Sequence, residues 1–107
     1  MSESQFNQMI DDLLMNLEEQ LDDLDVDIDY ETAGGVLTLI FENGTQIIIN
    51  RQTPVRQLWL ATRTGGFHFD RDDASGEWHR DTDGAEFFAI LNENCSLQAG
   101  APVTLTP

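Results

Sequence analysis

Basic residues are the scarcest class in this chain. There is no lysine, and 5 arginines stand against 20 aspartates and glutamates, which leaves a formal net charge of −15. A chain this acidic repels phosphate groups, so roles in binding nucleic acid or an anionic membrane surface are excluded. The same charge attracts metal cations and the basic surfaces of other proteins, and these are the partners that we expect.

Cysteine is nearly absent as well. The single thiol, Cys95, excludes an internal disulfide framework and is typical of a reducing compartment. The first residues contain no basic segment followed by an apolar one, and no apolar run approaches the roughly 20 residues needed to cross a bilayer. We therefore expect a soluble cytoplasmic protein, with residues 1–107 in one domain.

Acidic residues, in contrast, are abundant and unevenly distributed. Residues 1–31 contain 11 of the 20 and no arginine, whereas residues 32–107 contain the other 9 and all 5 arginines. A general adaptation to salt would spread acidic residues over the whole surface. Their concentration in the first third of the chain predicts a localised site.

The periodicity of residues 4–24 predicts an amphipathic helix. Its apolar stripe consists of Phe6, Met9, Ile10, Leu13, Leu14, Leu17, Leu21 and Leu24. At about 100° per residue, the opposite face carries Asp11, Asp12, Glu18, Glu19, Asp22 and Asp23. Some of these like charges lie four residues apart, a spacing that destabilises a helix. They also lie near the helix C-terminus, where anions are disfavoured, and no basic residue is nearby in the sequence to compensate them. Such violations tend to mark functional sites.

Strict alternation in residues 25–31 predicts a half-buried strand, with Val26, Ile28 and Tyr30 on one side and four carboxylates on the other. Further strands are expected at 36–42, 45–50 and 57–62, around 67–70 and around 77–80, and Asn43-Gly44 is a strong hairpin signal.

A second helix is expected after Asp83 and Glu86, which are spaced like a capping box. It is followed by an irregular tail over 98–107, whose Val103 and Leu105 pack on the core. The order of elements predicts an α+β fold. We expect a two-layer α-β sandwich, with the N- and C-terminal helices on one face of a single antiparallel sheet of about six strands.

The other face of this sheet is expected to be open. If Leu58 and Leu60 face the helices, Trp59 faces water, near Ile48 and Asn50 of the preceding strand. Trp78, in contrast, is expected in the core. A tryptophan among polar side chains on an exposed sheet is a natural anchor for a protein partner.

The acidic segment does not match a known chelating loop. Asp25-x-Asp27-x-Asp29 opens like an EF-hand, but Tyr30 replaces the required glycine and Val36 the closing glutamate. Carboxylates on one face of a strand lie about 6.5–7 Å apart, too far to share one ion easily. We therefore expect an exposed, oxygen-only surface that binds hard or borderline cations weakly at several positions.

No catalytic signature is present, so we do not expect an enzyme. His68 and His79 lack the spacing of a zinc motif. His68 would add a nitrogen ligand if it lay near a carboxylate, although an ordinary strand histidine is the commoner case. Cys95 is spaced with Leu91 along the second helix and is expected to be a buried or semi-buried thiol.

Several motifs in the middle of the chain resemble the frataxin family, and most closely its bacterial members. They are Gly-Gly-Val-Leu-Thr-Leu at 34–39, Phe-Glu-Asn-Gly at 41–44, Ile-Ile-Ile-Asn-Arg-Gln-Thr-Pro at 47–54, Gln-Leu-Trp-Leu-Ala-Thr at 57–62 and Gly-Gly-Phe-His-Phe at 65–69. The similarity spans nearly the whole chain, and it implies the two-layer fold already expected from the element order.

The resemblance also implies a function in iron–sulfur cluster assembly. Frataxins bind iron, ferrous or ferric, through an acidic ridge, which maps here onto Glu18, Glu19, Asp22, Asp23, Asp25, Asp27 and Asp29. Other divalent or trivalent cations are expected to substitute. The expected partners are the cysteine desulfurase, whose activity bacterial members slow in an iron-dependent way, and the iron–sulfur scaffold protein. The sheet surface associated with these contacts maps onto Asn50, Gln52, Gln57 and Trp59. Without metal we expect a monomer.

Three alternatives stay open at this point. The first is an iron chaperone or store that delivers iron to the scaffold. A ferroxidase is the second, although it would need a fixed redox site that the strand spacing disfavours. The third is an acidic decoy that blocks a nucleic-acid-binding protein and needs only charge.

Overall fold

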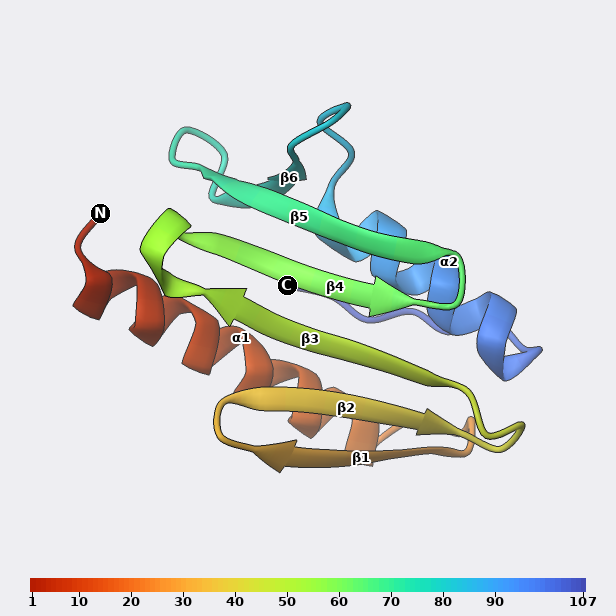
Figure 1. The fold of residues 1–107 in the computed structure, drawn as a ribbon. Helices are drawn as coiled ribbons and strands as arrows, with labels where there is room; N and C mark the ends of the chain where they lie inside the picture. Colours follow the sequence, from red (N-terminus) through yellow and green to blue (C-terminus); the bar gives the residue numbers. More distant parts are fainter.

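The computed structural model describes residues 1–107 as two layers, a single sheet with both helices on one side of it (Figure 1). The elements are α1 (Glu3–Asp22), β1 (Ile28–Ala33), β2 (Val36–Phe41), β3 (Gln46–Gln52), the 3₁₀ turn η1 (Thr53–Val55), β4 (Gln57–Thr62), β5 (Gly65–Asp72), β6 (Glu77–Arg80) and α2 (Phe87–Ala99). The six strands lie in chain order and every neighbouring pair is antiparallel. The predicted fold class is confirmed.

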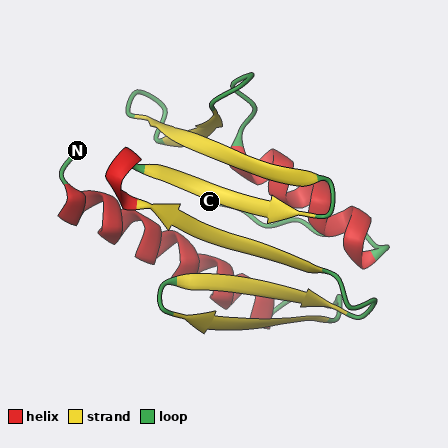
Figure 2. Ribbon diagram, in the orientation of Figure 1, coloured by secondary structure: helices red, strands yellow, loops and turns green.

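The two helices cover the same face of this meander, which Figure 2 shows from its open side. Short turns make the meander possible. Gly44 has φ of 84° in the turn after β2, where Asn43 Oδ1 accepts a hydrogen bond from the Thr45 backbone N–H at 3.0 Å. Asn43 and Gly44 therefore form the turn that their dipeptide predicts.

The core fills the space between helices and sheet with 22 buried hydrophobic residues. The apolar stripe of α1 supplies five of them, Phe6, Ile10, Leu14, Leu17 and Leu21. Trp78 and Cys95 are buried, as predicted, and Val103 and Leu105 of the C-terminal tail pack into the same cluster. The tail is held between the helices, because the Thr106 carbonyl accepts from Gln20 of α1 and the Leu105 carbonyl from Asn92 of α2.

The first strand begins later than the alternating pattern predicts. β1 starts at Ile28, so Asp25, Val26 and Asp27 lie in the connection from α1 rather than in the sheet. Ile28 pairs with Phe41, the last residue of β2, after which that chain enters its turn. Residues before Ile28 therefore have no neighbouring strand, and alternation alone cannot make a strand without a partner.

The second helix also differs from its predicted bounds. Its N-cap is Glu86, whose carboxylate accepts from the Phe88 and Ala89 backbone N–H groups, while Asp83 instead forms an ion pair with Arg80. The helix continues to Ala99, so Gln98 is a buried helical residue and not the start of the tail. The side chain of Gln98 explains this extension, because it bonds the Gln46 carbonyl and the Arg63 N–H.

Two strands are longer than predicted, since β3 continues to Gln52 and β5 extends over Gly65–Asp72. Neither helix is long and apolar enough to cross a membrane.

Candidate functional site

The seven residues of the acidic ridge come from three consecutive pieces of structure. Glu18, Glu19 and Asp22 lie in the last turns of α1, Asp23 is its C-cap, Asp25 and Asp27 lie in the connection, and Asp29 is in β1. Glu18 is half-buried and the other six are exposed. Four of them, Asp22, Asp25, Asp27 and Asp29, line one hollow of about 520 Å³.

Tyr30 joins the helix to the first strand inside this hollow. Its hydroxyl donates to Asp22 Oδ1 at 2.8 Å. This hydrogen bond, partial desolvation and the charges of Asp22 and Glu18 raise the pKa of Tyr30. The sequence placed Tyr30 on the inner side of a strand, so its contact with the ridge was not predicted.

Glu42 is a second residue that the sequence did not assign to the site. It directly follows β2, opposite the start of β1, where it meets Asp27. A hydrogen bond to Asp27 and the charge of that carboxylate, with a smaller contribution from desolvation, raise the pKa of Glu42. Glu42 therefore adds a carboxylate next to the ridge at Asp27.

The ridge is nevertheless an open surface and not a preformed chelate. No three aspartate, glutamate, histidine or cysteine side chains anywhere in the chain lie close enough together to hold one metal ion. The ridge residues offer only carboxylate oxygens, which suit hard cations bound by one or two protein ligands with water completing the coordination.

None of the seven ridge residues takes part in an ion pair. Farther along α1 the situation differs, because Arg51 of β3 reaches Asp11 at 2.6 Å. Asp11, on the same face of the helix, is thus compensated by a basic residue that is distant in the sequence. For the ridge itself, the negative charge remains available to external cations.

The open face of the sheet carries the predicted partner surface. Trp59 of β4 lies directly between Asn50 of β3 and His68 of β5, and Gln52 pairs with Gln57 at the end of the same two strands. The Trp59 indole N–H donates to Gln57 Oε1 at 3.2 Å. The four residues Asn50, Gln52, Gln57 and Trp59 are therefore contiguous, and Leu58 and Leu60 are buried on the opposite face as the parity predicts.

His68 is part of this sheet surface and not of the ridge. Its ring stacks on Trp59 with 4.1 Å between centroids and 14° between planes. Its Nδ1 lies 3.8 Å from Asp81 Oδ2. His68 itself is in β5, four strands away from β1 and the ridge. The stacked pair holds the Trp59 ring in place on an otherwise polar surface.

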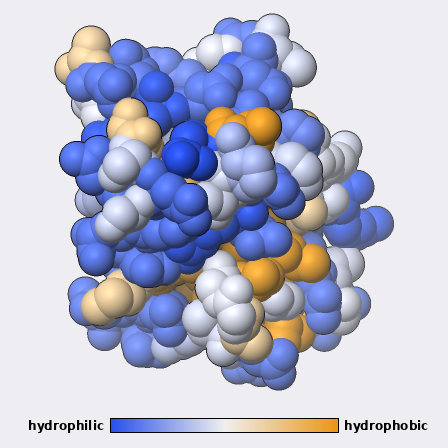
Figure 3. All heavy atoms as spheres, turned by 60° about the vertical axis from the view of Figure 1, so that its left-hand side comes forward, coloured by the Kyte–Doolittle hydropathy of each residue, from blue (hydrophilic) through white to orange (hydrophobic).

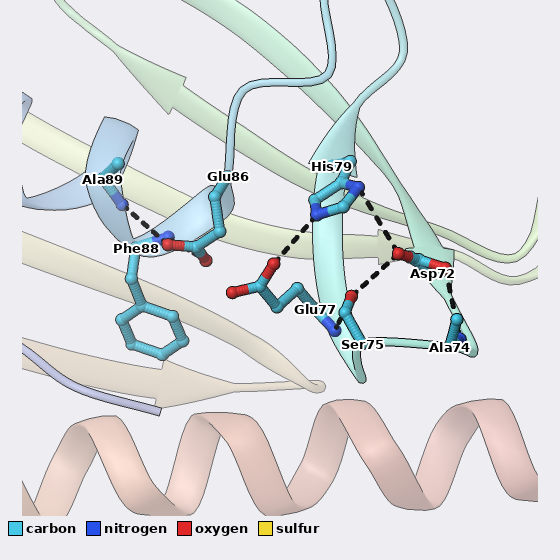
Figure 4. A network of polar contacts seen from close by, with 8 residues as sticks. All are labelled: Asp72, Ala74, Ser75, Glu77, His79, Glu86, Phe88 and Ala89. Carbon is cyan, nitrogen blue, oxygen red and sulfur yellow. Dashed lines mark hydrogen bonds and ion pairs between the residues drawn. The ribbon is translucent and has the colours of Figure 1, made fainter.

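His79 lies in a separate network on the β5–β6 hairpin, shown in Figure 4. Its Nε2 lies 3.0 Å from Glu77 Oε1, and its Nδ1 lies 3.9 Å from Asp72 Oδ2. Hydrogen bonds from the Ser75 hydroxyl and the Ala74 N–H, together with the nearby His79, lower the pKa of Asp72. The two ring nitrogens thus face different carboxylates, and the network orders the hairpin turn.

The remaining reactive group is unsuited to catalysis. Burial raises the pKa of the Cys95 thiol to about 12, which keeps it protonated and unreactive. No base contacts it.

The comparisons with known proteins agree with this arrangement. The family model described as a frataxin-like domain matches residues 1–101. The chain is 53% identical over 104 residues to the iron-sulfur cluster assembly protein CyaY of Pseudoalteromonas atlantica, covering 97% of this chain and 94% of that protein.

Two solved structures extend the likeness to the fold. Frataxin from Psychromonas ingrahamii superposes with a TM-score of 0.90 at 40% identity and full coverage of both chains. Trimeric frataxin from the yeast Saccharomyces cerevisiae, complexed with ferrous, gives a TM-score of 0.69 at 31% identity over 94% of this chain and 88% of that one. On the combined match of sequence and fold, the chain belongs to the frataxin family.

Proposed function

We propose that this chain acts as a single frataxin-like domain in iron–sulfur cluster assembly. In this role it binds iron, docks on the cysteine desulfurase and slows cluster formation in an iron-dependent way. The observation that carries the proposal is the acidic ridge, whose seven carboxylates have no internal ion-pair partner. A protein that leaves so much unpaired charge on one surface loses stability through self-repulsion, which suggests that an external cationic partner uses that surface.

Relatives support the chemical identity of that partner. The 53% identical protein is named for iron–sulfur cluster assembly, and the yeast relative was solved with ferrous iron. A surface of exposed oxygen ligands suits ferrous or ferric iron held weakly at several positions, and other divalent or trivalent cations can substitute.

Iron and the desulfurase would meet at the same surface. Four of the seven carboxylates, those of Asp22, Asp25, Asp27 and Asp29, line one open hollow, where cations can bind at neighbouring positions. A bound cation changes the charge that a basic patch of the desulfurase encounters, and this is the physical basis for an iron-dependent effect on docking.

The sheet face supplies a second contact. Trp59, held by His68 and Gln57, presents a rigid aromatic ring bordered by Asn50 and Gln52. Such a ring is suited to bind a pocket on a protein partner, and we assign it to the desulfurase–scaffold assembly. On this proposal the protein is not an enzyme, and it is a monomer without metal.

The test measures sulfide release and cluster formation by a bacterial cysteine desulfurase with its scaffold, with and without ferrous iron. The ridge variant is Glu19→Lys with Asp23→Lys, because both side chains are exposed and neither makes a side-chain hydrogen bond, unlike Asp22. The matched control is Asp73→Lys with Glu93→Lys, which changes the net charge equally on exposed positions away from the ridge.

The wild-type protein is expected to slow both rates with dose, more steeply with iron. The ridge variant should lose this effect, whereas the control variant should keep most of it. Equal behaviour of the two variants would contradict a localised docking surface.

An iron chaperone or store is the second candidate, and the four-carboxylate hollow is the observation that favours it. It predicts stoichiometric ferrous binding and iron transfer to the scaffold, with no effect of saturating protein on sulfide release. Sulfide release at saturating wild-type protein, measured alongside iron transfer to the scaffold, separates the two candidates, because only the first predicts that sulfide release slows.

A further inference from the structure

A groove on the helix side of the molecule is not used by the function proposed above. It has a volume of about 300 Å³ and lies between the middle of α1, the start of β6 and the start of α2. Its α1 residues, Asp12, Leu13 and Asn16, precede the ridge, and Asp12 is about 15 Å along the helix axis from Asp22. The groove is therefore a separate surface.

The groove combines an apolar floor with an acidic rim. Leu13, Trp78 and Phe88 form the floor. Asp12, Glu77 and Glu86 are the charged residues of the lining, and Arg71 lies at its border, with its guanidinium carbon 5.7 Å from the centre of the Trp78 ring. On the face drawn in Figure 3, hydrophilic residues cover most of the surface, and hydrophobic residues show in separate patches.

Two of the three carboxylates keep an oxygen without a partner. Asp12 Oδ1 accepts from Gln8 and Glu77 Oε1 contacts His79, so Asp12 Oδ2 and Glu77 Oε2 remain available. Glu86 is different, because both of its oxygens accept backbone N–H groups at the start of α2. Figure 4 shows the Glu86 carboxylate turned toward the start of α2 and one Glu77 oxygen turned toward His79.

We infer that this groove binds an arginine side chain carried by a basic segment of a partner protein. An apolar floor accommodates the methylene stem, since long cationic side chains bury their stems and keep the charge in water. The guanidinium has a planar fork of donors that can serve two carboxylates, whereas an ammonium is a compact point charge. Because Arg71 of the chain itself already lies over the Trp78 ring, the preference for arginine rests on the Asp12 and Glu77 carboxylates.

The inference does not depend on the acidic ridge or on the desulfurase. None of its lining residues belongs to the ridge or to the Trp59 surface. Loss of docking in the ridge variant would therefore leave the groove unaffected, and the reverse also holds.

The test uses the full chain carrying Trp59→Phe, which leaves Trp78 as the only tryptophan. Its single indole N–H signal is followed by NMR during titration with an acetylated, amidated Gly-Ala-Arg-Ala-Gly peptide. Matched peptides carry citrulline, which keeps the shape without the charge, or lysine. The same titration is repeated with Asp12→Asn plus Glu77→Gln, and with Asp23→Asn plus Glu31→Gln as the control of equal charge outside the groove.

The arginine peptide is expected to shift the Trp78 signal saturably, with weaker binding of lysine and none of citrulline. The groove variant should bind about two- to thirtyfold more weakly, since two surface ion pairs are lost, and in every case by a larger factor than the control. The inference is overturned if the Trp78 signal does not move, or if the citrulline or lysine peptide binds as well as the arginine peptide. It is also overturned if the groove variant and the control variant lose the same affinity.

Discussion

Replacing Asp23 by lysine is expected to make the protein more stable and less functional at the same time. Asp23 is the exposed C-cap of α1, one turn after Glu19, and the last turn of this helix contains no basic residue. Asp23→Lys therefore changes a carboxylate at the negative end of the helix dipole into a cation.

Three contributions act in the same direction. The substitution removes a like-charge pair with Glu19, which costs about 0.2–0.5 kcal/mol, and replaces it by an attractive glutamate–lysine pair of similar size in the favoured orientation. The interaction with the helix C-terminus adds about 0.3–1 kcal/mol. The free energy of unfolding should rise by about 1 kcal/mol in total, which corresponds to an increase in Tm of roughly 4–8 °C for a domain of this size.

The assay is urea denaturation followed by far-UV circular dichroism, at low salt and in 1 M NaCl. The gain should be largest at low salt and mostly lost in 1 M NaCl, where the Debye length falls to about 3 Å. Asp73→Lys in the β5–β6 turn is the control, because it changes the net charge equally without touching a helix. If Asp23→Lys is neutral or destabilising at low salt, or if the control gains as much, then local repulsion in α1 is not the cause.

The remaining predictions concern the core and two titratable groups. Leu39→Ala, at a fully buried position in β2, should lower the free energy of unfolding by about 2–5 kcal/mol in urea denaturation with an unchanged m-value. Cys95, with its pKa raised to about 12, should stay unmodified by iodoacetamide at pH 8 until urea unfolds the protein. The stability that the protonated thiol contributes should be lost as the pH rises above the pKa of the thiol in the unfolded chain. The Arg80 guanidinium lowers the pKa of Asp83 to about 2. The pair therefore stabilises the fold above the pKa that Asp83 has in the unfolded chain, and this stabilisation is lost as the pH falls toward 2. In Arg80→Gln, an NMR titration should show the pKa of Asp83 returning toward 3.8.

Most of the fold could be predicted because local signals and the burial pattern agree. The apolar stripe of α1 matches its buried residues, and Asn43-Gly44 forms the turn that it predicts. The parity of β4, with Leu58 and Leu60 inward and Trp59 outward, followed from the period of a strand alone. Where one face of an element is buried, its residue pattern determines which way that element faces.

Features that depend on a neighbouring segment could not be predicted in this way. The start of β1 is determined by the end of β2, and the contact of Glu42 with Asp27 exists only because those two strands pair. The stacking of His68 on Trp59 likewise depends on the register between β4 and β5. In each case the missing information was a long-range pairing and not a local preference.

The distribution of charge separates the two contacts that we propose for this small domain. The ridge occupies the end of α1 and the β1 edge of the sheet, whereas Trp59 lies in β4, near the middle of the open face. An edge strand rich in carboxylates also resists pairing with a second copy, because like charges would be brought together. The same residues thus keep the edge of the sheet available for a cationic partner. It follows that neutralising the ridge should weaken selective docking and at the same time increase self-association, whereas Trp59→Ala should weaken only the contact of the open face.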